Sequence, residues 1–127
     1  MKGKESLQNA RNLLLKLHKL LIDRERAAYE DTNGPVGSAE FVNLLIGDPS
    51  FAWLRRFSTL IVEVDEMFDQ KDGIESTRVD ELLEKVRNLI EMKDTDDDFR
   101  TKYQESLRTD INLAELQKEI NDAITPP

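Results

Sequence analysis

The sequence predicts an all-α protein, because its hydrophobic pattern and its punctuation both favour helices. Apolar residues recur at intervals of three and four, and no stretch of convincing length alternates between apolar and polar residues. The 127 residues include only five glycines and four prolines, so few positions interrupt a helix. We therefore expect one domain over residues 1–127, an up-and-down helical bundle of four main helices plus one or two short helices.

The first predicted helix covers residues 5–30, which contain no glycine or proline. Its apolar arc is broader than usual, which implies contacts with neighbours on more than one side. A loop follows at 32–37, where Asn-Gly and Gly-Pro pairs signal turns. Ser38 can then cap a short helix over 39–46, and Gly47 ends it.

The next stretch, residues 48–69, is the one around which we expect the rest of the chain to pack. Asp48 is a good N-cap, and Pro49 suits the first helical position, where a missing N–H costs nothing. The stretch holds the only tryptophan and three of the five phenylalanines. Its apolar residues at helical spacing are Trp53, Phe57, Leu60, Ile61, Val64 and Phe68.

Two further helical regions follow a turn at 70–73. One helix is predicted from Ser76 or Thr77 to Met92. The segment 95–98 resembles a capping box with Thr95 as the cap, and it introduces a helical region over 99–124. Either one bent helix or two helices fit that region, since Thr109 and Asp110 have weak helix propensity.

Charge and composition bear on the possible partners. The formal net charge is −8, and it is divided into +2 over residues 1–62 and −10 over residues 63–127. Phosphate backbones need clustered lysine and arginine, so this balance argues against nucleic acid and against an anionic membrane surface. Without cysteine there is no disulfide, thiolate nucleophile or cysteine-based metal site.

The N-terminal segment imitates a signal peptide, with Lys2 and Lys4 ahead of a leucine-rich run. Lys16, His18 and Lys19 interrupt that run, and no small-residue cleavage site follows. The run is also too short and too charged to span a bilayer. We expect no signal peptide and a cytoplasmic protein.

Metal and cofactor sites are not expected. A di-metal centre in a helical bundle needs Glu-x-x-His on two helices, and the single histidine has Leu15 three residues before it. Asp94, Asp96, Asp98 and Glu105 match positions 1, 3, 5 and 12 of a calcium loop. Phe99, however, occupies the position that requires glycine, so the aspartates read as helix caps.

No catalytic residues are predicted either. The chain lacks a glycine-rich phosphate loop, a nucleophile elbow and a dinucleotide fingerprint. A catalytic triad would have to be built on His18, and no serine lies beside it in sequence. His18 reads first as a partly buried histidine at the edge of a core face.

Two charged residues on apolar faces provide the candidate site. Arg24 and Asp65 lie where core residues are expected, and an unpaired buried charge costs several kcal/mol. We hypothesise that they pair between the first and third helices, joined by Arg56, Tyr29 or His18. The cluster is either a structural salt bridge or the floor of a ligand-binding pocket lined by Trp53 and Phe57.

The stretch 51–66 resembles a pattern in small hypothetical all-helical bacterial proteins. Residues 25–30, Gly34-Pro35 and the segment 99–103 fit the same pattern. The resemblance implies a free-standing bacterial cytoplasmic domain, and it carries no activity, cofactor or functional residue.

These observations together favour a non-enzymatic helical module that binds a protein partner or a small molecule, and a homodimer is one form of this. The alternative is an enzyme or ligand sensor with a cavity near His18, Arg24, Trp53 and Asp65. An exposed apolar groove or a two-fold interface would favour the module, and a closed cavity would favour the alternative.

Overall fold

A computed structural model describes residues 2–70, 73–93 and 95–125 of the chain. Within these ranges the protein is all-α, with no sheet, as the sequence predicts. Six α-helices and one 3-10 helix follow in the order α1 (Lys2–Asn33), α2 (Ser38–Gly47), η1 (Pro49–Leu54), α3 (Arg55–Phe68), α4 (Ser76–Ile90), α5 (Asp97–Thr109) and α6 (Ile111–Ile124).

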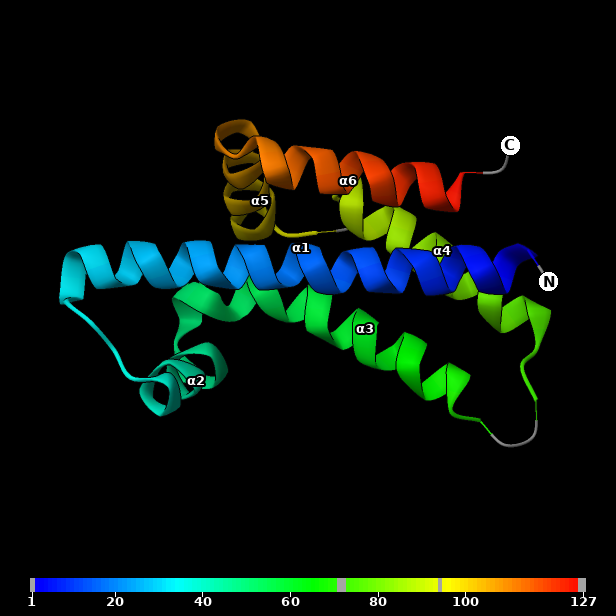
Figure 1. Cartoon of the computed structure of the whole chain (residues 1–127), viewed down its shortest axis with the longest axis horizontal. Helices are drawn as coiled ribbons and strands as arrows, with labels where there is room; N and C mark the ends of the chain where they lie inside the picture. The colour runs from blue at the N-terminus through cyan, green and yellow to red at the C-terminus, as the bar shows by residue number, and fades with distance from the viewer. Residues whose placement is uncertain (1, 71–72, 94, 126–127) are drawn as a thin grey trace.

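Helix α1 lies at the centre, and α3, α4 and α6 all pack against it. Figure 1 shows it running the length of the molecule between α6 and α3, with α4 behind. Successive long helices alternate in direction, α1 and α4 towards one end and α3 and α6 towards the other. The helix has one row of fully buried side chains at alternating spacings of three and four, namely Leu7, Ala10, Leu14, Leu17 and Leu21.

Near the start of α1, this helix lies so close to α4 that little room is left beside Gly3. A Cβ atom on Gly3 would lie 3.2 Å from a methyl group of Val79. Gly3 lies four positions before Leu7, on the same face of α1 as the buried row, and is itself half-buried. A small residue is therefore what lets the two helices pack at this point.

The predicted helix over 48–69 is present, but it consists of two consecutive helical elements. The Asp48 carboxylate accepts a hydrogen bond from the Ser50 backbone N–H at 2.9 Å, and Pro49 opens the first turn, as predicted. The first six residues are a 3-10 helix, η1, and the α-helical part begins at Arg55. Three of the six residues of this short element are buried in the core, namely Phe51, Trp53 and Leu54.

Aromatic rings from η1, α3 and α5 pack together in the core. Phe57 is fully buried, and its ring centroid lies 5.3 Å from that of Tyr103 and 5.5 Å from that of Phe99. The Trp53 ring meets Phe99 nearly edge-on, with 5.9 Å between the centroids. Edge-to-face and offset arrangements at these distances stabilise aromatic clusters.

The C-terminal region is two helices, and one aspartate separates them. Asp110 has extended backbone angles, φ −133° and ψ 107°, which end α5. Its carboxylate then accepts a hydrogen bond from the Asn112 backbone N–H at 3.0 Å, which caps α6. Figure 1 shows α5 set steeply across the direction of α6.

The cap of α5 is Asp96, so the prediction of Thr95 is wrong by one residue. The Asp96 carboxylate accepts from the Phe99 backbone N–H at 2.8 Å, and this bond lowers the pKa of Asp96. Thr95 instead donates its hydroxyl to the Met92 carbonyl at 2.8 Å. Asp94, the first residue of the calcium-like pattern, lies outside the described residues.

Helix α4 ends at Ile90, two residues before the predicted end. Met92 adopts a left-handed conformation with φ 60°, and its N–H donates to the Leu89 carbonyl at 3.1 Å. The Lys93 N–H donates to the Asn88 carbonyl at 2.8 Å. These two bonds make the C-terminal turn that usually contains glycine, and they fix Lys93 beside the end of α4.

Candidate functional site

The expected pair of Arg24 and Asp65 does not form. Asp65 instead receives a two-pronged hydrogen bond from Arg11, with 2.8 Å from Nε to Oδ1 and 3.0 Å from Nη2 to Oδ2. Helices α1 and α3 run in opposite directions, so the late α3 residue meets the early part of α1. Arg24 lies thirteen residues further along α1, about 20 Å at 1.5 Å per residue. Arg24 also points from another face of α1, because thirteen residues turn an α-helix to a direction about 140° away from that of Arg11. The expected pairing was therefore wrong both in position along α1 and in helix face.

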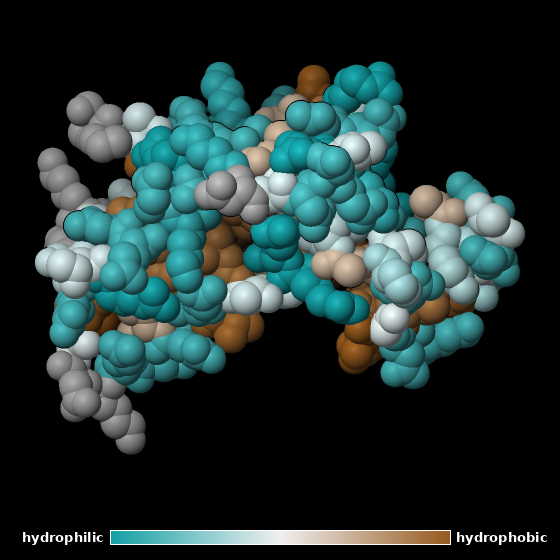
Figure 2. All heavy atoms as spheres, turned by 180° about the vertical axis from the view of Figure 1, so that it is seen from behind, coloured by the Kyte–Doolittle hydropathy of each residue, from teal (hydrophilic) through white to brown (hydrophobic). Residues whose placement is uncertain are grey.

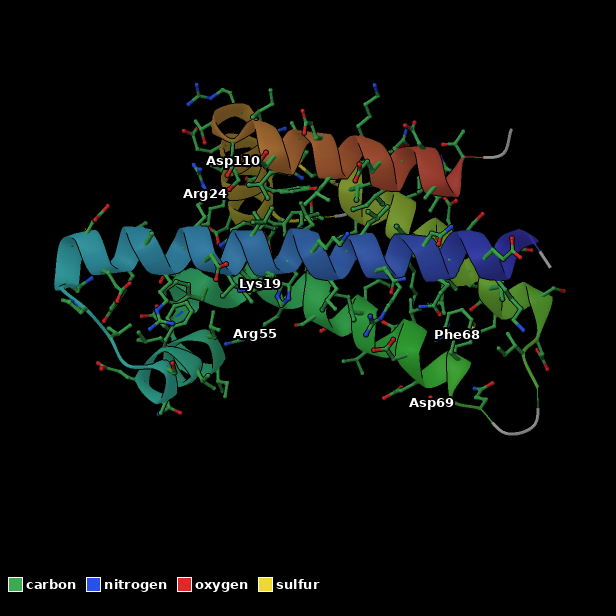
Figure 3. The ribbon with its side chains drawn as sticks, in the orientation of Figure 1. Lys19, Arg24, Arg55, Phe68, Asp69 and Asp110 are labelled. Atoms are coloured by element: carbon green, nitrogen blue, oxygen red, sulfur yellow. The ribbon has the colours of Figure 1, made fainter. Side chains whose placement is uncertain are left out.

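Arg24 belongs to a polar contact between α1 and α5. Its Nη2 donates to the hydroxyl of Thr109, the last residue of α5. In Figure 3 the Arg24 label lies on the α5 side of α1, close to Asp110. The neighbouring Glu25 is half-buried, and the loss of hydration raises its pKa despite the nearby charges of Lys102 and Arg24.

Trp53 and Arg56 both contact the ring of Phe99, near the start of α5. The Trp53 side chain is 3% exposed, so it is part of the core and does not line an open pocket. The Arg56 guanidinium lies 5.5 Å from the centre of the Phe99 ring and 3.6 Å from an Asp96 carboxylate oxygen. Both contacts attach the start of α5 to α3.

Tyr29 lies near the end of α1, where it packs against η1. Its ring centroid is 6.1 Å from that of Phe51, and Phe51 in turn meets Phe41 of α2 at 5.8 Å. The Arg26 guanidinium lies 5.2 Å from the Phe41 ring centre and donates to the Val36 carbonyl at 2.7 Å. The six predicted site residues are thus spread over several contacts along α1, η1 and α3.

Two of the predicted residues, His18 and Arg56, lie on open depressions of the surface, and His18 lies on the one beside α2. The His18 ring stacks on Phe57 with 6.3 Å between centroids and 29° between planes. Burial lowers its pKa, because the imidazolium form loses hydration. The depression, here the α1–α2 groove, has a volume of about 310 Å³ and is lined by His18, Ile22, Leu45, Ile46, Phe51, Leu54, Arg55 and Ser58.

A second hollow extends the α1–α2 groove along α1. It shares His18 and Ile22 with the groove and adds Leu15, Lys16, Lys19 and Asp23. Figure 3 labels Lys19 on α1 and Arg55 at the start of α3, which belong to these linings. The surface is mostly apolar, with cationic side chains along its margin.

The lining of the α1–α2 groove includes one imidazole and one serine hydroxyl. His18 and Ser58 line it together, which the sequence did not show. The Ser58 hydroxyl donates to the Arg55 carbonyl at 3.1 Å, and no hydrogen bond joins it to His18 within the described residues. The same residues contain no group of three or more histidine, aspartate or glutamate side chains that could hold a metal ion.

Helix α2 forms one wall of this groove, which was not predicted from the sequence. Helix α2 is apolar around most of its circumference, and Phe41 is its buried residue. Val42 and Ile46 remain 50% and 67% exposed. A ten-residue helix that is apolar around most of its circumference, beside a glycine-rich loop, was the available signal.

No protein-family model matches the chain, and no curated protein or solved structure does so either. The all-helical class is supported by the structure, and the resemblance to bacterial proteins gains no family from these comparisons. Among the helices described, none is long and apolar enough to cross a membrane.

The pairing of Arg11 with Asp65 is tested by a double-mutant cycle. We expect Arg11→Gln and Asp65→Asn to show a coupling free energy of about 1 kcal/mol in urea unfolding, since the pair is bidentate but partly exposed. The control cycle of Arg24→Gln with Asp65→Asn should show no coupling. Coupling in the control cycle alone would show that Asp65 pairs with Arg24, as the sequence predicted, and not with Arg11.

The environment of His18 predicts a pKa below the ordinary value of about 6.5. Neutral His18 is favoured in the folded state, so its contribution to stability is present above pH 6.5 and is lost as pH falls towards the folded pKa. A proton NMR titration of the single imidazole measures this directly. The urea-unfolded chain is the control, and an equal or higher pKa in the folded chain would contradict the burial of His18.

Proposed function

We propose that this protein is a non-enzymatic helical module, built on an up-and-down bundle of α1, α3, α4 and α6, that binds a protein partner. The partner's contact is an amphipathic helix that lays its apolar face in the α1–α2 groove. The observation that carries the proposal is the uncovered apolar surface of α2 beside an apolar groove on the bundle.

The exposure of individual side chains supports this proposal. Ile46 on α2 and Leu15 on α1 are 67% and 45% exposed, and both line the groove or its extension. In Figure 2 brown apolar surface is visible on the smaller lobe, which contains α2 and the end of α1. Covering these side chains would release free energy at about 25 cal/mol per Å² of apolar surface buried.

Charge at the margin indicates the kind of helix. The linings of the groove and its extension include the cationic Lys16, Lys19 and Arg55 and one acidic residue, Asp23. Lys19 pairs with Asp23 at 3.1 Å, which leaves Lys16 facing solvent without an acidic partner among the described residues. A partner helix with acidic residues beside its apolar stripe therefore fits better than a basic one.

Other occupants of the groove lead to different results. A second copy of this chain would bury the same surface in a homodimer, although the net charge of −8 disfavours self-association. A small apolar ligand in the volume of about 310 Å³ would support the sensor alternative. An enzyme would need His18 to act on a bound substrate.

We expect a designed amphipathic peptide with glutamates beside a leucine stripe to bind, as measured by fluorescence anisotropy. A lysine-flanked peptide and a scrambled peptide should bind at least about tenfold more weakly, a difference of 1.4 kcal/mol. Ile46→Asp should reduce the affinity by a similar factor, because it places a charge in the apolar groove.

The matched control is Ile111→Asp on α6, since Ile111 is 73% exposed and does not line the groove. It should bind the peptide like the unaltered protein. Equal loss in both variants, or no difference among the peptides, would reject the proposal. Sedimentation showing a dimer that Ile46→Asp dissociates would assign the groove to a second copy instead.

A further inference from the structure

A separate groove, here the α3–α4 groove, lies between α3 and α4. The side chains that line it carry a net positive charge, whereas the chain as a whole is negatively charged. The groove has a volume of about 390 Å³, within the range of small-molecule sites. Four cationic side chains line it, and Glu63 is the one acidic residue of the lining. Local positive charge in a protein of net charge −8 is not what composition alone would give.

Three separate elements bring the cations together. Arg55 and Arg56 come from the start of α3, Lys85 from α4, and Lys93 from the turn after α4. The hydrogen bonds of Met92 and Lys93 that end α4 hold the last of these in place. Arg55 donates to the carbonyls of Leu45 and Ile46 at the end of α2, so Arg56, Lys85 and Lys93 remain for a ligand.

The ion pairs that these three cations make are partly exposed to solvent. Lys85 contacts Glu63 at 2.7 Å, and its side chain is 49% exposed. Lys93 contacts Glu91 at 3.3 Å, and the Arg56 contact with Asp96 is 3.6 Å long. Exposed pairs of this kind contribute about 0–1 kcal/mol each, so a bound anion can replace them at low cost.

The floor of the groove is apolar. Leu60 and Leu89 are 5% and 7% exposed and close the groove between the two helices. Thr59 and Asn88 add uncharged polar groups beside them. An apolar floor with a cationic margin suits a ligand that has both an apolar body and an anionic group.

We propose that the α3–α4 groove binds a small organic phosphate monoester, with its apolar body over Leu60 and Leu89. The phosphate dianion would accept hydrogen bonds from Arg56, Lys85 and Lys93, since arginine and lysine are the side chains that bind phosphate oxygens. This site is separate from the α1–α2 groove, apart from Arg55, whose side chain lines both.

Calorimetric titration with phenyl phosphate tests the proposal, with inorganic phosphate and phenol as the separated halves of the ligand. Phenyl phosphate should bind at least about tenfold more tightly than either half. The double variant Lys85→Gln, Lys93→Gln should weaken binding at least fivefold. Glu63→Gln should strengthen it at least twofold, because it removes the one acidic side chain of the lining.

Lys16→Gln is the matched control, because Lys16 is an exposed lysine beside the other groove. Its affinity for phenyl phosphate should be unchanged, and circular dichroism should show that every variant is folded. Equal affinity for phenyl phosphate and inorganic phosphate, an unaffected double variant, or an equal loss in Lys16→Gln would overturn the proposal. Weaker or unchanged binding in Glu63→Gln would do so as well.

Discussion

The burial of one row of side chains along α1 is the constraint on which the other contacts depend. Every residue of the row that runs from Leu7 to Leu21 is fully buried. Helices α4 and α6 cover this row, and α3 with η1 packs on the neighbouring face of α1. A short helical protein has few other ways to bury so much apolar surface, since its remaining helices are at most 15 residues long.

The position of both grooves follows from this arrangement. Helices α3 and α4 both pack against α1, and a shallow groove remains where they meet each other. At the far end of α1, α2 is attached through Phe41 and Phe51, and the rest of its apolar surface is left open. The α1–α2 groove is therefore the space between a well-packed bundle and a less covered helix.

Local signals in the sequence predicted local structure well. Asp48 and Pro49 gave the start of a helix, and the weak propensity of Thr109 and Asp110 allowed the break that the structure has. Arg24 continues the spacing of the buried row by three residues beyond Leu21, so its unusual position was visible in the sequence. These features depend on neighbours within a few residues, which is why the sequence carries them.

Contacts between helices were less predictable. Asp65 was correctly expected to need a cation, but the packing of α1 decides which one it meets. Arg11 points towards α3 and reaches Asp65, whereas Arg24 points towards α5 and bonds to Thr109. His18 was correctly placed at the edge of the core, whereas its neighbours Leu45 and Ile46 come from α2, a separate helix that begins after the loop 34–37. The residues of the candidate site are therefore brought together by contacts between helices, which the spacing of apolar residues in the sequence does not predict.

The central role of α1 is tested most directly by comparing two adjacent leucines. Leu14 is fully buried in the row, and Leu15 is 45% exposed one position further on. In chemical unfolding we predict that Leu14→Ala lowers the free energy of unfolding by about 2–5 kcal/mol. Leu15→Ala should lower it by less than about 1 kcal/mol. Equal effects, or a larger effect at Leu15, would contradict the account of α1 as the helix around which the protein packs.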